Sequence, residues 1–120
     1  MQVILVIEDN VENMYLLRFL LRKNGFDVIE AYTGEEGVEV AISRHPDLIL
    51  VDIQLSGING LEAVRQIRSV AGLNKTPIIA VTSFAMTGDR EKALEAGCDD
   101  YIEKPIDPET FVEQIRIHMS

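Results

Sequence analysis

The side chains able to do chemistry in this 120-residue chain stand directly after short apolar runs. They are three carboxylates, one hydroxyl and one ammonium: Glu8, Asp9, Asp52, Thr82 and Lys104. Carboxylate oxygens with no His or Cys beside them in the sequence favour a hard cation such as Mg²⁺ over zinc or copper. Two carboxylates about 4 Å apart repel each other by about 4 kcal/mol at an effective dielectric of 20. Three of them gathered at one place therefore require a cation, and a magnesium-holding acidic cluster is the predicted chemistry.

The apolar runs have the composition of buried parallel strands. Val3–Ile7, Leu48–Val51 and Ile78–Val81 show no polar alternation, and an unbroken apolar strand is covered on both of its faces. Two shorter runs, Val28–Ile29 and Tyr101–Ile102, are predicted to lie nearer the edges of the same sheet.

Amphipathic stretches fill the gaps between these runs and predict five helices. Their markers are Val11–Asn24 with its apolar face of Met14, Leu16, Leu17, Leu20 and Leu21, the capping box of Thr33 with Glu36, the stripe of Leu61, Val64 and Ile67, the pair Ala93 and Leu94, and the N-cap sequence Asp107-Pro108-Glu109. Each marker has a physical basis in helix capping or in the 3.6-residue period. Gly25 is expected to end the first helix.

The alternation of strand and helix predicts an α/β fold, namely a single doubly wound domain of five βα units. Right-handed crossovers place helices on both faces of such a sheet. Ligands of open α/β sheets bind outside the carboxyl ends of the strands, where the strand order reverses. Because the candidate residues all follow strands, they are expected to meet at that edge.

Composition excludes several classes of function. The formal net charge is −9, from 20 acidic and 11 basic residues, whereas a nucleic-acid binder needs a basic face. No apolar run approaches the roughly 20 residues of a membrane helix, and the first residues lack the basic segment of a signal peptide. The single cysteine, Cys98, fits a reducing cytoplasm and is expected to be a small buried filler. A cytoplasmic protein without nucleic-acid or membrane contact is therefore predicted, with His45 and His118 solvated at helix ends.

Four segments of the chain resemble those of bacterial response-regulator receiver domains: Val6–Asn10, Leu50–Asp52, Val81–Ser83 and Tyr101–Pro105. The resemblance covers the whole chain, in order and at the family's usual spacing. It implies a flavodoxin-like (βα)5 receiver domain over residues 1–120, with strand order 2-1-3-4-5. The stretch 82–89 is similar both to single-domain regulators and to receivers fused to hybrid sensor kinases, so both arrangements stay open.

The resemblance also implies a role for each site residue. Asp52 takes the place of the phosphoacceptor, Asp9 that of a direct Mg²⁺ ligand, and Glu8 that of a second acid acting through water. The backbone carbonyl of Gln54 would complete the protein ligands, and Lys104 would pair with the phosphoryl group. Glu8 replaces the family's more usual aspartate, which leaves the detail of the metal geometry open.

A conformational switch is implied in the same way. Thr82 would donate its hydroxyl to a phosphoryl oxygen, which would draw the following loop inward and move Tyr101 from exposed to buried. The Lys104–Pro105 peptide bond is expected to be cis. The domain would signal by a change in the surface formed by the fourth helix, the fifth strand and the fifth helix. Phe84 and Gln54 occupy positions that tune the phosphoryl lifetime in the family, and their identities do not predict that lifetime.

The implied partners are a sensor histidine kinase or a histidine phosphotransfer protein, together with a downstream protein effector. Such a domain is not an ordinary enzyme, since it catalyses only its own phosphorylation and dephosphorylation. One alternative is a Mg²⁺-dependent phosphohydrolase with an aspartyl nucleophile, although these enzymes generally carry a second aspartate where Gln54 stands. Another is a pseudo-receiver that binds partners without phosphorylation. Taken singly, Glu8 and Asp9 could also be helix-capping residues, and Asp52 could be a structural partner of Lys104.

Overall fold

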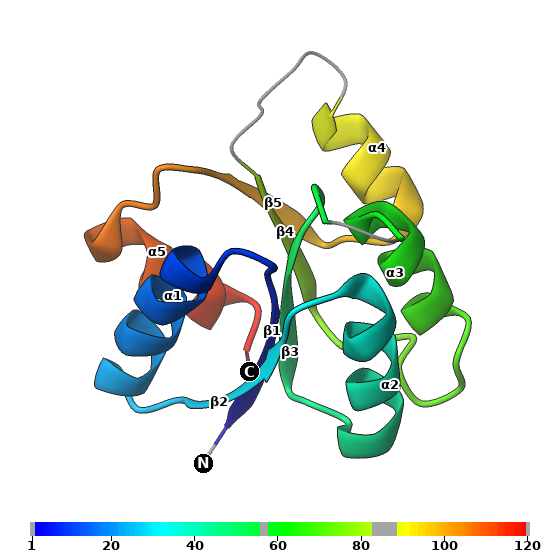
Figure 1. Ribbon diagram of the computed structural model, residues 1–120, viewed down its shortest axis with the longest axis horizontal. Helices are drawn as coiled ribbons and strands as arrows, with labels where there is room; N and C mark the ends of the chain where they lie inside the picture. The colour runs from blue at the N-terminus through cyan, green and yellow to red at the C-terminus, as the bar shows by residue number, and fades with distance from the viewer. Residues whose placement is uncertain (1, 56–57, 83–88, 120) are drawn as a thin grey trace.

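Parallel strands form the centre of the structure, a computed structural model that describes residues 2–55, 58–82 and 89–119 (Figure 1). The strands are β1 (Val3–Ile7), β2 (Asp27–Ala31), β3 (Leu48–Asp52), β4 (Ile78–Thr82) and β5 (Asp100–Glu103). The helices are α1 (Val11–Lys23), α2 (Gly34–Arg44), α3 (Gly60–Arg68), α4 (Asp89–Ala96) and α5 (Pro108–Ile117). Strand and helix alternate along the chain, as the sequence predicted.

The sheet has the order β2-β1-β3-β4-β5, and every neighbouring pair of strands is parallel. This confirms the predicted fold class and strand order. Helices α1 and α5 cover one face of the sheet, and α2, α3 and α4 cover the other (Figure 1). The strand order reverses between the neighbours β1 and β3, so the carboxyl ends of these two strands flank the switch point.

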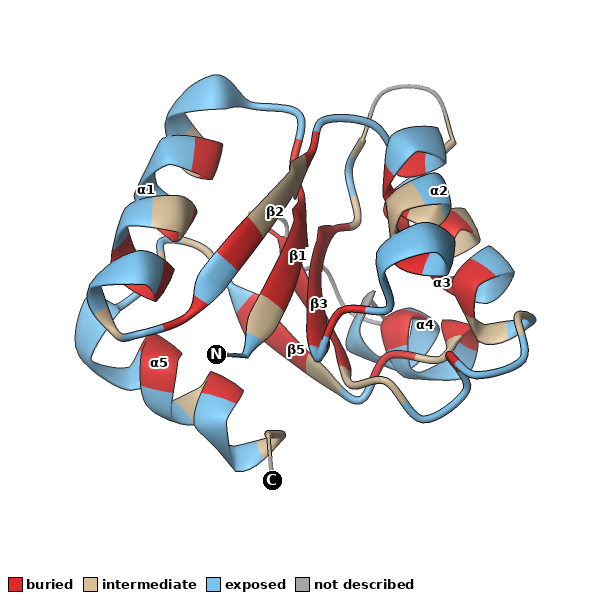
Figure 2. Cartoon of the chain, turned by 90° about the horizontal axis from the view of Figure 1, so that it is seen from below, coloured by how far each residue is buried: buried red, intermediate tan, exposed pale blue. Residues whose placement is uncertain are grey.

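Burial follows the position of each strand in the sheet. All five residues of β3 and of β4 are buried, and so are four of the five residues of β1. The edge strands β2 and β5 are less completely covered, with Asp27 and Glu103 exposed (Figure 2). The unbroken apolar runs therefore mark the central strands, as expected for strands covered by helices on both faces.

Three element boundaries and the position of one side chain differ from the sequence prediction. Strands β3 and β4 extend to Asp52 and Thr82, because main-chain pairing continues one residue past the last apolar side chain. Helix α1 ends at Lys23, one residue earlier than predicted. Leu16 was predicted in the apolar face of this helix but is 41% exposed, because only a narrow stripe of α1 faces the sheet.

The predicted helix caps are present, with one change of partner. The Thr33 hydroxyl accepts a hydrogen bond from the Glu36 N–H at 3.0 Å. The Glu36 carboxylate accepts from the N–H of Tyr32 at 2.6 Å, one residue before the cap, instead of returning to Thr33 itself. Asp107 caps α5 with its side chain, and a proline follows it at the first helical position. Local capping chemistry thus fixes where these two helices begin.

The histidines and the cysteine differ in how well the sequence placed them. His45 is exposed, as expected. His118 is not simply solvated, because its Nε2 lies 2.9 Å from Oδ2 of Asp100 and so ties the end of α5 to β5. Cys98 is buried, and burial raises the pKa of its thiol to about 12. The prediction of a small buried filler at this position is confirmed.

Arg68, the last residue of α3, holds together the end of the sheet opposite the candidate residues. Its guanidinium donates to the carbonyls of Gly97, Leu73 and Thr76 at 2.9, 3.0 and 2.6 Å, and to Oδ2 of Asp99 at 2.7 Å. The same Asp99 oxygen accepts from the N–H of Ile78, the first residue of β4. One side chain therefore connects α3, the turn before β4 and the turn before β5.

Substitution of Arg68 by alanine is predicted to lower the free energy of unfolding by about 2–4 kcal/mol, because it leaves several carbonyl groups and Asp99 without their donor. Urea unfolding followed by circular dichroism measures the effect. Arg65→Ala on the same helix is the control, since the ion pair of Arg65 with Glu62, at 3.9 Å, is exposed, and its loss should cost less than about 0.5 kcal/mol. Equal losses for the two variants would contradict the role assigned to Arg68.

Candidate functional site

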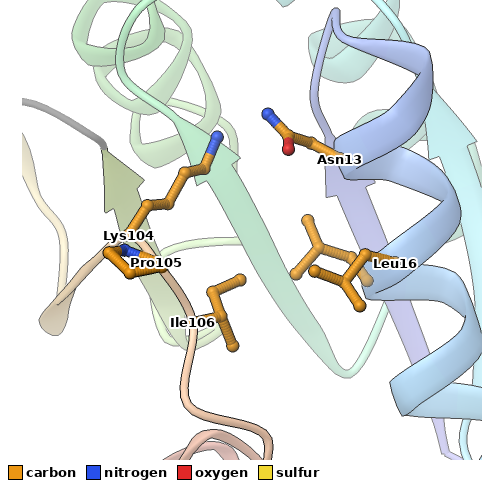
Figure 3. Close-up of a pocket in the computed structure, with 6 residues that line it drawn as sticks. Asn13, Leu16, Lys104, Pro105 and Ile106 are labelled. Atoms are coloured by element: carbon orange, nitrogen blue, oxygen red, sulfur yellow. The ribbon is translucent and has the colours of Figure 1, made fainter.

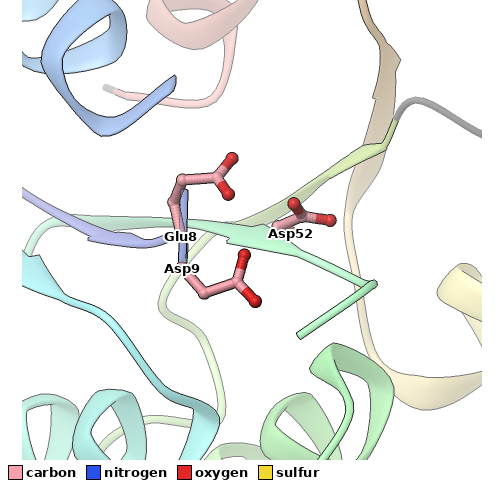
Figure 4. Close-up of side chains that lie close together, drawn as sticks. All are labelled: Glu8, Asp9 and Asp52. Atoms are coloured by element: carbon pink, nitrogen blue, oxygen red, sulfur yellow. The ribbon is translucent and has the colours of Figure 1, made fainter. Parts of the chain in front are cut away.

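Acidic side chains meet at the carboxyl ends of β1 and β3. Glu8 and Asp9 follow β1, Asp52 is the last residue of β3, and the pairing of Ile7 with Val51 places these strand ends side by side. One oxygen from each of Glu8, Asp9 and Asp52 lies within 4.8 Å of the others (Figure 4). The acids that the sequence predicted to gather at one edge of the sheet are therefore brought together.

Both carboxylate oxygens of Asp52 are held in place. The backbone N–H of Gln54 donates to Oδ1 at 2.9 Å, and the Lys104 ammonium lies 3.2 Å from Oδ2. Its side chain is 9% exposed, so Asp52 is largely covered but still partly accessible to solvent. An oriented, partly accessible carboxylate has the geometry that a nucleophile requires.

Glu8 is the most deeply buried acid of the cluster, with 1% exposure. Its Oε1 accepts from the Lys104 ammonium at 2.7 Å, and its Oε2 accepts from the backbone N–H of Asn10 at 3.1 Å. Burial raises the pKa of Glu8 above its ordinary value, and the hydrogen bonds from Lys104 and Asn10 offset this effect only in part. Asp9 differs from Glu8 in being exposed, so it presents its carboxylate to solvent beside Asp52 (Figure 4).

Lys104 carries the positive charge of the site and comes from the chain that follows β5. Its side chain is 12% exposed and contacts both Glu8 and Asp52. Burial is the largest single effect on the pKa of Lys104 and lowers it, but the hydrogen bond to Glu8 and the charges of both acids together raise the pKa above its ordinary value. The lysine is therefore a permanent cation between two buried carboxylates.

The backbone around Lys104 fixes the direction of its side chain. Its N–H donates to the carbonyl of Thr82 at 2.8 Å, which extends the pairing of β4 with β5. The Lys104–Pro105 peptide bond is cis, the geometry that the resemblance implied. Beyond it, Lys104, Pro105 and Ile106 line a cavity of about 160 Å³ (Figure 3). The other residues that line it come from α1 and are Asn13, Leu16 and Leu17.

Gly60 is a site residue that the sequence did not reveal. A Cβ added at Gly60 would stand 2.3 Å from the carbonyl oxygen of Asp52 and 2.5 Å from Cα of Ile53. Its N–H also donates to the Ile53 carbonyl at 3.3 Å. The absence of a side chain lets the start of α3 pack directly on the backbone that carries Asp52. The only signal in the sequence was a glycine that opens a helix shortly after an acid-terminated strand.

Thr82 and Tyr101 lie on the same face of the sheet. Thr82 follows two residues after Ala80 on β4, and Ala80 is paired with Tyr101 on β5. Thr82 is fully buried, and Tyr101 is 9% exposed, with its side chain in the core between the sheet and α4. The predicted switch moves Tyr101 between an exposed and a buried position, and this structure has it in the buried one. Ser83 and Phe84, also singled out in the sequence, lie outside the described residues.

Comparison with known proteins identifies the family. The sequence model of the response regulator receiver domain matches residues 4–116. The chain belongs to the response regulator receiver family. Receiver domains are signalling modules of two-component systems, not classical enzymes, and they interact with histidine kinases and with effectors.

Relatives of this receiver domain are similar over nearly their full length. The polar-differentiation response regulator DivK of Brucella ovis is 41% identical over 116 residues, which cover 97% of this chain and 94% of the relative. The receiver domain of sensor histidine kinase PA1611 from Pseudomonas aeruginosa PAO1 is 38% identical with a TM-score of 0.87, and the match covers 98% of this chain and 93% of that one. That structure has a magnesium ion coordinated in its active site cleft. A CheY-like receiver domain protein from Methanospirillum hungatei JF-1 gives a TM-score of 0.91 at 27% identity, with 98% and 92% coverage.

The Glu8–Lys104 contact predicts a pH-dependent stability for Lys104→Met. The raised pKa of Glu8 means that the folded receiver domain holds this proton more tightly than the unfolded chain. The contribution of Glu8 to stability is therefore present at low pH and is lost as pH rises through the ordinary carboxyl range toward the folded pKa. Removing Lys104 raises that pKa further. We predict that Lys104→Met, measured with EDTA present, is more destabilising at pH 7 than at pH 5 by about 1–2 kcal/mol.

Two further variants separate this effect from a general loss of charge. Lys75→Met, at an exposed position, should cost the same at both pH values. Glu8→Gln combined with Lys104→Met should abolish most of the pH dependence, because the acid with the raised pKa is gone. A Lys104→Met variant whose destabilisation is independent of pH would show that Lys104 does not control the ionisation of Glu8.

Proposed function

We propose that this receiver domain accepts a phosphoryl group on Asp52 from a histidine kinase or a histidine phosphotransfer protein. The observation that carries the proposal is the placement of the Asp52 carboxylate, which is oriented by Gln54 N–H and lies among Glu8, Asp9 and Lys104 at the carboxyl edge of the sheet. The relatives support it, since DivK is named a response regulator and the PA1611 structure is named the receiver domain of a sensor histidine kinase.

The acidic cluster fits a Mg²⁺ ion. Its donors are all carboxylate oxygens. Two ligand oxygens on opposite sides of Mg²⁺ lie about 4.2 Å apart, and one oxygen from each of the three acids lies within 4.8 Å of the others, which is a similar span. Asp9, Asp52 and the backbone carbonyl of Gln54 would be the direct protein ligands. Glu8 would act through water, because Lys104 and the Asn10 N–H already occupy its two oxygens. When bound, Mg²⁺ supplies positive charge that offsets the charge on the transferring phosphoryl oxygens.

The protein groups would act on the phosphoryl group in separate ways. A carboxylate oxygen of Asp52 attacks the phosphorus of a phosphohistidine in line, a P–O bond forms, the P–N bond breaks, and the imidazole leaves with a proton from solvent. Lys104, released from Asp52, pairs with a phosphoryl oxygen. The Thr82 hydroxyl donates to another phosphoryl oxygen. Phosphoryl transfer depends mainly on positioning and on electrostatics, which these three side chains provide.

The same contacts would set the signalling state. Thr82 moves toward the phosphoryl group, and this movement stabilises Tyr101, on the same face of the sheet, in the buried position that it occupies in this structure. The surface formed by α4, β5 and α5 then changes shape and binds a downstream protein effector. To invert a 1:99 population of the active state, phosphorylation must favour that state by about 5.5 kcal/mol.

The proposed partners are proteins, without direct contact to nucleic acid or membrane. The net charge of −9 opposes binding to phosphate polymers. Within the described residues, no helix has the length and apolarity needed to cross a bilayer. The order of partners would be a phosphorylated histidine upstream and an effector surface downstream.

The phosphohydrolase alternative lacks a general acid. Gln54 stands two residues after Asp52, where such enzymes generally carry an aspartate, and an amide cannot transfer a proton as a carboxyl group does. Steady turnover of p-nitrophenyl phosphate in the presence of Mg²⁺ would favour that alternative. The pseudo-receiver alternative would instead show neither Mg²⁺ binding nor phosphorylation.

Incubation with acetyl phosphate and Mg²⁺ should produce a singly phosphorylated species that migrates more slowly on a Phos-tag gel. Asp52→Asn should abolish the shift, because the amide cannot form the acyl phosphate. Asp27→Asn, which alters an exposed acid at the opposite end of the strands, should be phosphorylated like the wild type. Phosphorylation of Asp52→Asn to the wild-type extent would refute Asp52 as the acceptor.

Removal of a direct ligand should weaken Mg²⁺ binding. Asp9→Ala is expected to raise the dissociation constant for Mg²⁺ by roughly tenfold or more in isothermal titration calorimetry, since it deletes one of the negative charges at the cation. Glu12→Ala is the matched control, because Glu12 is an exposed acid in the first turn of α1 outside the cluster. Unchanged affinity in Asp9→Ala would place the cation elsewhere.

A further inference from the structure

The outer face of α1 exposes a row of large apolar side chains. Val11, Tyr15 and Phe19 are 69%, 60% and 51% exposed, and they are spaced by four residues along the helix. Side chains at this spacing form one ridge on a helix surface, the feature that packs against a second helix. We call this row, together with Arg18, Arg22 and Lys23 beside it, the α1 ridge; Figure 2 shows the exposed outer side of α1.

The side chains of the α1 ridge contact one another. The rings of Tyr15 and Phe19 are stacked with their centroids 6.5 Å apart and 13° between their planes. The Arg18 guanidinium lies 5.6 Å from the centre of the Tyr15 ring, and the Lys23 ammonium lies 5.8 Å from that of Phe19. Cation–π contacts of this kind restrain long side chains, which lowers the entropy lost when a partner docks.

The charge of the α1 ridge is opposite to that of the chain. Arg18 is paired with both oxygens of Glu30 at 2.8 and 2.9 Å. Arg22 and Lys23 are exposed, and neither forms an ion pair with a described residue. These two cations and the aromatic rings line one shallow hollow on the helix surface. In a chain of net charge −9, this hollow is a local site for negative charge.

The α1 ridge extends away from the acidic cluster. Helix α1 begins next to Glu8 and Asp9 and runs antiparallel to the strands for 13 residues, about 20 Å. Arg22 and Lys23, in the last turn of α1, therefore lie toward the end of the sheet opposite the carboxyl end of β3, where Asp52 stands. The cavity beside Lys104 uses Asn13 and Leu16, on another side of the helix. An occupant of the cationic end of the ridge thus leaves Asp52 accessible.

We propose that the α1 ridge docks an acidic amphipathic helix of a partner protein while the Asp52 site remains open. The apolar row would pack against the apolar face of that helix, and its acids would meet Arg22 and Lys23. Aromatic residues and arginine are the side chains enriched at the centres of protein interfaces. A nucleic acid or an anionic bilayer would present negative charge to the whole acidic chain, whereas a single helix presents it to the ridge alone. The proposal is independent of phosphorylation.

Fluorescence anisotropy of the full chain with two synthetic helical peptides tests this inference. Each labelled peptide has about 18 residues, enough to span α1, with leucines on one face and either glutamates or lysines elsewhere. The glutamate peptide should bind at least about tenfold more tightly than the lysine peptide. Phe19→Ala should weaken its binding about tenfold, and the double variant Arg22→Glu/Lys23→Glu should invert the preference between the peptides. The glutamate peptide should bind equally well to Asp52→Asn.

The control is Arg90→Glu/Lys92→Glu, which reverses two exposed cations on α4 and should leave both affinities unchanged. Equal binding of the two peptides, no binding of either, or a preference that survives reversal of Arg22 and Lys23 would overturn the proposal. Evidence for another kind of occupant would also overturn it. Such evidence would be dimerisation in size-exclusion chromatography, or binding to phosphatidylglycerol vesicles or to single-stranded DNA, provided that Arg22→Glu/Lys23→Glu abolishes the effect. Circular dichroism should show unchanged unfolding for the α1 and α4 variants, since each side chain substituted on these two helices is exposed.

Discussion

The structure of this receiver domain depends on offsetting the repulsion between acids that lie close together. The positive charge of the Lys104 ammonium offsets it. Glu8 and Asp52 arrive from neighbouring strands at the centre of the sheet. Lys104 arrives from the far end of the chain, 96 residues from Glu8. The site therefore forms only when β1, β3 and β5 are all in register. Misfolding of the sheet would also remove the site. A buried pair of this kind contributes little net stability, but an unpaired buried charge is costly.

The length of the Glu8 side chain gives this acid a different role from that of Asp9 and Asp52. Its extra methylene group, compared with aspartate, lets one carboxylate reach both Lys104 and the N–H of Asn10 while it stays buried. The carboxylate of Asp9 is exposed instead, and that of Asp52 is partly accessible. Glu8 thus holds the lysine from a buried position, and the other two acids are nearer to solvent. The length of the Glu8 side chain therefore separates a structural role, the contact with Lys104, from the role of binding a cation.

The sequence was sufficient for features that depend on local chemistry. Unbroken apolar runs predicted the central strands, and Thr33 and Asp107 predicted where two helices begin. The convergence of acids at one edge followed from the rule that parallel strands end together. Features that depend on contacts between distant segments were not predictable. Gly60 lacks a side chain because the Asp52 backbone lies against it, and Arg68 is placed by three carbonyls and Asp99. The exposure of Leu16 likewise depends on how α1 is rotated against the sheet.

The burial of Cys98 has a practical consequence for watching this molecule work. Its thiol is covered and burial raises its pKa to about 12, so it is protonated at neutral pH, whereas maleimide dyes react with an accessible thiolate. A cysteine introduced at an exposed position would then be labelled selectively on an otherwise natural background. A fluorophore attached in that way could report motion without first deleting the native thiol from the core.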